Sequence, residues 1–192
     1  KSSLVTIDMT SGRMTELGTE HSEELEAQEL SAIDAKRGRY YTMGVDTTNQ
    51  TNTVVMVVWN LADGKISKKV ALPFAGEPFV GIGEAIDVDP TDGTIIVMGH
   101  DSSRGGHHAV YTLDPTSYKP TFIADIGGSM KADGMGTTTT YDYDEKVVYL
   151  VTAVMNNSAT PPAPYFKHSA VSITDGSVTD LPVSLIMQGA AY

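Results

Sequence analysis

The stretch AIDVDPTDGTIIV, residues 85–97, reads as two short β-strands joined by a tight turn. Its central Asp-Pro-Thr-Asp-Gly segment favours a turn, since proline fixes its own φ and glycine tolerates a positive one. Related strand pairs occur at residues 31–46 and 139–154. The three pairs contain aligned aspartates 53 and 55 residues apart, which are Asp34, Asp87 and Asp142. This spacing predicts an internally repeated, all-β fold.

A second hairpin follows the first in each repeat, and one more precedes the first repeat. These hairpins occupy residues 4–17, 54–72, 109–125 and 170–183. Each repeat is therefore predicted to be a four-stranded antiparallel meander of about 50 residues, the size of a β-propeller blade. We expect three complete blades at residues 29–73, 83–127 and 135–184. Parts of blades are expected at residues 1–18 and 185–192, so that residues 1–192 form one propeller domain or a propeller fragment.

The repeat core of residues 85–97 resembles the "apolar-Asp-Pro-x-x-Gly-x-apolar-apolar-Val" pattern of propeller blades of the YVTN, NHL and quinoprotein-like kind. The resemblance covers nearly all of the chain. It implies the blade architecture and carries over no catalytic residue, because those families share the blade while differing in activity.

Charge and composition exclude several functions. Thirteen Lys and Arg residues against 24 Asp and Glu give a net charge of −11, and this acidity argues against a nucleic-acid partner. The absence of cysteine excludes disulfides, thiolate catalysis and zinc–thiolate sites. No apolar run approaches the roughly 18 residues that a membrane span needs. The opening Lys-Ser-Ser leads us to expect processing or truncation upstream.

Residues 20–29 are rich in glutamate and lack a sustained helical stripe. We expect them to form an acidic loop between blades, with at most one helical turn. Their five glutamates would form a solvated face or dock a basic partner.

The order of the strands predicts an incomplete ring. The chain begins at the third strand of a blade and reaches only the first strand of another. Another chain or segment would complete the end blades, or the terminal strands would join into a small four-bladed ring. We therefore expect Val5 or Ile7 to be hydrogen-bonded in a sheet whose inner strand is not residues 31–34.

Propeller function usually lies on the face formed by the loops between second and third strands and between blades. Candidate residues for this binding face are Asp46, His100, Asp101, Arg104, His107, His108, Asp133, Asn156, Asn157, Tyr165 and His168.

Within this face, His100, Asp101 and His107 could bind a divalent ion such as Zn²⁺ or supply a general base. His107 and His108 are adjacent in a strand and point to opposite faces, so only one of them can join His100. No HExxH spacing supports a metal site. A solvated, hydrogen-bonding loop is the favoured interpretation.

The repeated aspartates allow two interpretations as well. They could bind Ca²⁺ around a central channel, or each could accept backbone N–H groups in the turn that ends its strand. Recurrence in every blade favours the structural role. The strand tyrosines are predicted to pack between blades, with carbohydrate stacking as the alternative, and are Tyr40, Tyr41, Tyr111, Tyr141, Tyr143 and Tyr149. Trp59 is predicted to lie in the core between blades.

Two sequons, at Asn49 and Asn156, fall in predicted loops between second and third strands. They favour an extracellular or secreted glycoprotein. The sequence as a whole predicts a non-catalytic binding or structural propeller for a protein or glycan partner, without a cofactor. The alternative is a metal-dependent propeller enzyme of the lactonase or lyase kind, which would use Ca²⁺ or Zn²⁺ with His100, Asp101 and His107.

Overall fold

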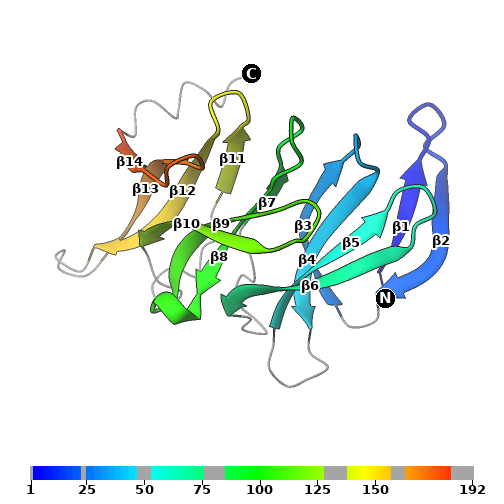
Figure 1. Cartoon of the computed structure of the whole chain (residues 1–192), viewed down its shortest axis with the longest axis horizontal. Coiled ribbons are helices and arrows are strands. Elements are labelled where there is room, and N and C mark those ends of the chain that lie inside the picture. Colours follow the sequence, from blue (N-terminus) through cyan, green and yellow to red (C-terminus); the bar gives the residue numbers. More distant parts are fainter. Residues whose placement is uncertain are drawn as a thin grey trace.

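The computed structural model describes residues 2–22, 25–46, 53–75, 85–127, 138–156 and 163–182. These residues form one two-stranded and three four-stranded sheets, all antiparallel. The sheets follow one another in chain order along the long axis (Figure 1). Within each four-stranded sheet, consecutive strands are neighbours, as the meander pattern predicted. The all-β prediction is confirmed.

The strand bounds follow the repeat. The two-stranded sheet contains β1 (Ser2–Ile7) and β2 (Met14–Ser22). The next sheet contains β3 (Leu25–Asp34), β4 (Arg39–Asp46), β5 (Thr53–Asn60) and β6 (Ile66–Ala75). The third contains β7 (Ala85–Val88), β8 (Ile95–Asp101), β9 (His107–Leu113) and β10 (Pro120–Gly127), with a 3₁₀ turn η1 (Ser102–Arg104). The last contains β11 (Thr138–Asp142), β12 (Val147–Asn156), β13 (Ala163–Ser172) and β14 (Val178–Leu181).

The prediction of an acidic loop at residues 20–29 is wrong. The described part of this segment belongs to the end of β2 and the beginning of β3. Glutamates are disfavoured in strands only weakly, and pairing of β3 with β4 outweighs that preference.

Seven described hairpin turns share one geometry. The side chain of the first turn residue accepts the backbone N–H two or three residues further on, as Asp34 does from Arg37 and Asp142 from Asp144 and Glu145. The fifth turn residue has a positive φ and is glycine in five of the turns. The structural interpretation of Asp34 and Asp142 is confirmed.

Asp87, however, does not hold the repeated turn position. Its carboxylate accepts the N–H of the adjacent Val88, whereas the first turn residue is Asp89, which accepts the N–H of Thr91. The true repeat therefore runs through Asp34, Asp89 and Asp142. Asp87 lies in β7 and Asp89 directly follows this strand, so the two aspartates are two residues apart, and the sequence pattern alone selected the wrong one.

The sheets pack face to face, and the core consists of the layers between them. One layer joins the sheet of β3–β6, through Met43, Met56 and Phe74, to β9 through Leu113. A second layer joins Met98, Val110 and Ile126 of the third sheet to Tyr141, Leu150 and Val171 of the last. Such layers explain why both faces of the inner sheets carry apolar residues.

The predicted aromatic core is largely present. Trp59 is buried, and its indole N–H donates to Thr42 Oγ1 over 3.1 Å. Tyr41, Tyr111 and Tyr141 are buried as well. Tyr143 and Tyr149 differ from the prediction, because both are exposed; Tyr143 lies in the turn after β11 and Tyr149 in β12.

The buried hydroxyl of Tyr41 allows a test of how the core contributes to stability. This hydroxyl has no hydrogen-bond partner among the described residues. Burial, with smaller contributions from Tyr118 and Asp34, raises the pKa of Tyr41 to about 12. Ionisation therefore favours the unfolded chain, and this contribution to stability is complete below about pH 10 and is lost as the pH rises toward about 12.

We expect Tyr41→Phe to leave the free energy of unfolding unchanged near neutral pH, or to raise it by up to about 1 kcal/mol. The variant should also lose less stability than the wild type between about pH 7 and about pH 11. Urea denaturation at both pH values measures this. A variant destabilised at neutral pH would show instead that the hydroxyl has a partner.

Candidate functional site

The end of β8, the η1 turn and the start of β9 bring most of the predicted polar cluster together. The antiparallel register places His100 opposite His108 and Asp101 opposite His107. Asp101 caps η1 by accepting the N–H of Ser103, and the turn ends at Gly105, whose φ is positive. The cluster is thus set by strand register and by one capped turn.

Asp101 is almost completely buried, and its carboxylate is fully engaged. It accepts hydrogen bonds from Ser103 N and Oγ at 2.9 and 2.6 Å and from the Tyr111 hydroxyl. Arg104 Nε lies 3.3 Å from its second oxygen. Burial alone would raise the pKa of Asp101, but the bonds from Ser103 and Tyr111 and the charge of Arg104 lower it. The carboxylate therefore remains ionised and holds the turn in place.

The histidines divide between the interior and the surface. The rings of His100 and His108 are both buried, with centroids 4.1 Å apart. His107 points the other way, and its Nδ1 lies 3.0 Å from Asp125 Oδ2. As predicted, only one of the two adjacent histidines joins His100. That residue is His108, so the set of His100, Asp101 and His107 is not assembled around one point.

Four partly exposed side chains remain over this cluster, and we call them the η1 patch: Arg104, His107, Phe122 and Asp125. The Arg104 guanidinium stacks over the Phe122 ring with 3.6 Å between its carbon and the ring centroid. Phe122 in turn contacts Tyr111 edge-to-face at 5.5 Å. The patch therefore combines a fixed cation, an aromatic ring and a His–Asp pair.

The other predicted face residues lie apart from this patch. Asp46 ends β4, opposite Thr53. His168 lies in the middle of β13, opposite Val151, and Tyr165 also lies in this strand, opposite Val154, so neither is in a loop. Asn156 is the last residue of β12. Asp133, Asn157 and the sequon at Asn49 fall outside the described residues.

The described residues provide no ligand set for a metal centre. No group of three or more His, Asp or Glu side chains among them lies close enough to hold a metal ion. His100 and His108 form a pair, but Asp101 directs its oxygens to Ser103, Tyr111 and Arg104. The Zn²⁺ or Ca²⁺ alternative is therefore not supported by this cluster.

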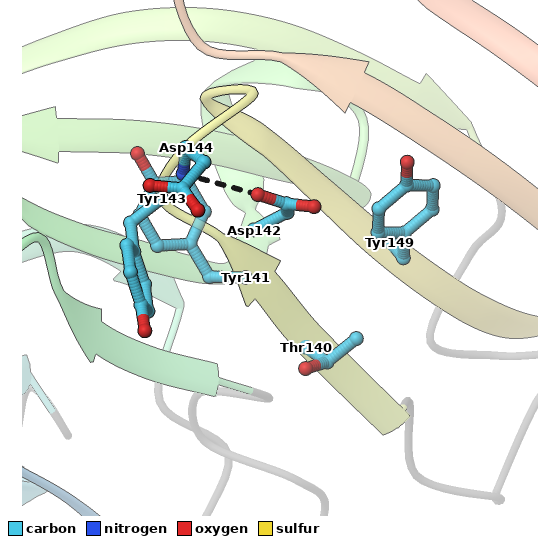
Figure 2. A pocket seen from close by; sticks show the side chains of 6 residues that line it. All are labelled: Thr140, Tyr141, Asp142, Tyr143, Asp144 and Tyr149. Carbon is cyan, nitrogen blue, oxygen red and sulfur yellow. Dashed lines mark hydrogen bonds between the residues drawn. The ribbon is translucent and has the colours of Figure 1, made fainter. Parts of the chain in front are cut away.

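One recess was not predicted as a pocket. It has a volume of about 400 Å³ beside the β11–β12 turn and is lined by Thr140, Tyr141, Asp142, Tyr143, Asp144 and Tyr149. Figure 2 shows Tyr141 and Tyr143 on one side of Asp142 and Tyr149 on the other. Tyr143 and Tyr149 expose their rings, whereas Tyr141 is buried. The recess places aromatic faces beside carboxylate acceptors. The strand tyrosines in the sequence suggested the aromatic faces alone.

Comparison with known proteins extends these observations. Neither a family model nor a curated protein matches the sequence. A chain in the crystal structure of a nidogen/laminin complex superposes with a TM-score of 0.58 at 13% identity, over 93% of this chain and 56% of that one. This chain thus spans just over half the length of the chain it matches. The matched structure is a propeller, and the likeness confirms the predicted propeller fold. No helix in the described part is long and apolar enough to cross a membrane.

Proposed function

We propose that this chain is a non-catalytic binding module, part of a larger assembly, that presents the η1 patch to a protein partner. The state of Asp101 carries the proposal. The only carboxylate of the candidate catalytic set is buried and bonded to Ser103 and Tyr111, with Arg104 beside it. It cannot serve as a base or a metal ligand without dismantling the turn. The lactonase or lyase alternative needs Asp101 as a base or metal ligand, so this arrangement argues against it.

The chemistry of the η1 patch suits protein recognition. Arginine and aromatic residues are enriched among the side chains that dominate binding energies. Asp101 and Phe122 hold Arg104 from two sides, so that little side-chain entropy is lost when a partner binds. The matched propeller chain comes from a complex with laminin, which supports a protein partner for this fold. An extracellular setting with glycans at Asn49 and Asn156 accords with that proposal.

The recess of Figure 2 supports a second candidate, a glycan ligand. Exposed tyrosine rings can stack on sugar faces, and Asp142 and Asp144 offer acceptors for hydroxyl groups. This candidate uses residues of the last sheet, whereas the η1 patch belongs to the third sheet, so the two can be separated by mutation.

We expect Arg104→Ala to weaken binding to a protein partner about 30-fold, the effect of losing a hot-spot arginine worth about 2 kcal/mol. Surface plasmon resonance against a panel of extracellular matrix proteins, laminin included, measures this. Arg104→Lys should recover only part of the affinity, because lysine keeps the charge but not the planar stacking on Phe122.

Lys65→Ala is the matched control, since Lys65 is exposed and lies 3.8 Å from Asp63 in a distant turn. It should bind as the wild type does. Equal binding by Arg104→Ala and wild type would contradict the role of the η1 patch. Loss of binding on Tyr149→Ala, with a glycan array as the readout, would favour the second candidate. Efficient turnover of a lactone that depends on Asp101 would overturn the non-catalytic proposal.

A further inference from the structure

We propose that the first and last sheets are the two halves of one sheet-to-sheet joint, and that a second copy of this chain docks head-to-tail to complete it. The proposal is independent of the η1 patch and of its partner. It rests on residues that are equivalent along the repeat, because every strand can be numbered from the shared turn that follows or precedes it.

The first half of the joint lies on β1. Ile7 directly precedes the first residue of its turn, as Trp59, Leu113 and Val171 do in the other sheets. Those three side chains are at most 2% exposed, whereas Ile7 is 54% exposed. Leu113 and Val171 each lie in the layer that joins their sheet to the preceding one. Ile7 thus occupies the position that meets a preceding sheet.

The second half lies on β13. Phe166 stands six residues before its turn, at the position of Val54 in β5 and His108 in β9. Val54 and His108 are at most 1% exposed, whereas Phe166 is 52% exposed. Val54 belongs to the layer that joins its sheet to the following one. Phe166 therefore marks a face that a following sheet would cover.

At two of the internal joints, a turn makes a close backbone contact with the preceding sheet. The positions where the equivalent contact is missing identify the same two ends. A Cβ on Gly64 would lie 1.6 Å from the carbonyl oxygen of Leu17, and one on Gly176 would lie 2.5 Å from that of Ile123. Each turn therefore rests on the outermost strand of the preceding sheet. Gly12 holds the equivalent turn position, and nothing lies within 4 Å of its Cβ site. The strand position equivalent to Leu17 and Ile123 in the last sheet is Leu181.

The two unmated halves belong to one chain but lie at opposite ends of it. Figure 1 shows β1 and β2 at one end of the row of sheets and β11–β14 at the other, so the halves do not meet within one copy. A second copy supplies both missing halves in the geometry that the internal joints already use. Such a contact is heterologous, since different surfaces of the two copies meet. Because β1 and β2 correspond to outer strands, they would cover Phe166 and Leu181 and leave the recess at Tyr149 open.

Sedimentation equilibrium of the full chain tests the proposal. We expect a species of at least twice the 20.5 kDa of one chain, dissociating on dilution. Ile7→Glu and Phe166→Glu should each raise the dissociation constant at least about 30-fold, because each places a charge inside the joint. Ile33→Glu is the matched control, since Ile33 is equally exposed but lies on neither half, and it should associate as the wild type does.

Mixing the two variants is the decisive experiment. Ile7→Glu retains an intact last sheet and Phe166→Glu an intact first sheet, so the two variants should associate with each other while neither associates with itself. If Ile7→Glu fails to fold by circular dichroism, Val5→Glu replaces it, because Val5 is 44% exposed and lies two residues before Ile7 on the same face of β1. A wild-type monomer at about 100 µM, a concentration above the µM to pM range of Kd that standard-sized interfaces span, would overturn the proposal. Association that survives both substitutions, or fails to be restored by mixing, would overturn it too.

Discussion

Asp89→Ala is expected to lower the free energy of unfolding by about 3 kcal/mol, the lower end of the range for breaking a buried ion pair. Asp89 is completely buried between two sheets and accepts hydrogen bonds from the Tyr141 hydroxyl at 3.0 Å and from the Lys146 ammonium. Both donors come from the following sheet. Alanine leaves both without their acceptor, and the effect stays at the lower end because Lys146 keeps about a third of its side chain in water.

Asp114→Ala is the matched control. Asp114 holds the same turn position and accepts the N–H groups of Thr116 and Ser117, but it is exposed and accepts no hydrogen bond from another sheet among the described residues. Its replacement should remove only the turn contacts, at about 1 kcal/mol. Urea denaturation of both variants measures the difference. Equal losses would show that the bonds between the sheets contribute nothing to stability.

The same site predicts an acid dependence. Burial alone would raise the pKa of Asp89, but the hydrogen bonds from Lys146, Thr91 and Tyr141 hold it well below its usual range. The folded pKa is therefore lower than the unfolded value of about 3.9, so this stabilisation is complete above about pH 5 and is lost as the pH falls below about 4. The acid-side slope of the unfolding free energy should be smaller in Asp89→Asn than in the wild type.

The repeat made the fold readable from the sequence, because turn chemistry is local. Each of the seven described turns contains an Asp, Asn or Ser that accepts nearby N–H groups and a residue with positive φ four positions later. Two of these positions hold Tyr118 and Lys146 in place of glycine. Both residues also contact a neighbouring sheet, Tyr118 beneath the Lys68 ammonium and Lys146 at Asp89. Contacts between sheets override the local preference at these two turns.

The candidate site was less predictable, because part of its arrangement depends on packing between sheets and not on local turn chemistry. Neighbours along the strands placed His100, Asp101, His107 and His108 together correctly, since hairpin register is a local property. Which histidine turns inward depends on the long-range packing of sheets, and that is invisible in a single sequence. The stacking of Arg104 on Phe122 joins residues from two different strands, and only the folded sheet brings them into contact.

Gly64→Ala is expected to destabilise the chain by about 1–3 kcal/mol more than Gly38→Ala, the cost of overpacking a close contact. Both glycines are fifth turn residues, with φ values of +67° and +62°, so both variants share the strain of a left-handed alanine. Nothing lies within 4 Å of a Cβ at Gly38, whereas a Cβ at Gly64 meets the Leu17 carbonyl oxygen and pushes β2 away from the turn.

Trp59 reports this displacement without further labelling, because it is the single tryptophan of the chain and lies buried in β5, the strand that leads into the Gly64 turn. By the repeat, its side chain takes the face that meets the sheet of β1 and β2. In Gly64→Ala we expect a red-shifted tryptophan emission before the main unfolding transition, as water reaches the indole, and in Gly38→Ala an emission like that of the wild type. Urea titrations of the two variants give the free energies alongside the spectra. If Gly64→Ala and Gly38→Ala were equally stable and the emission of Gly64→Ala were unchanged, β1 and β2 would not be packed against the following sheet. The internal joint from which the docking of a second copy is inferred would then be contradicted.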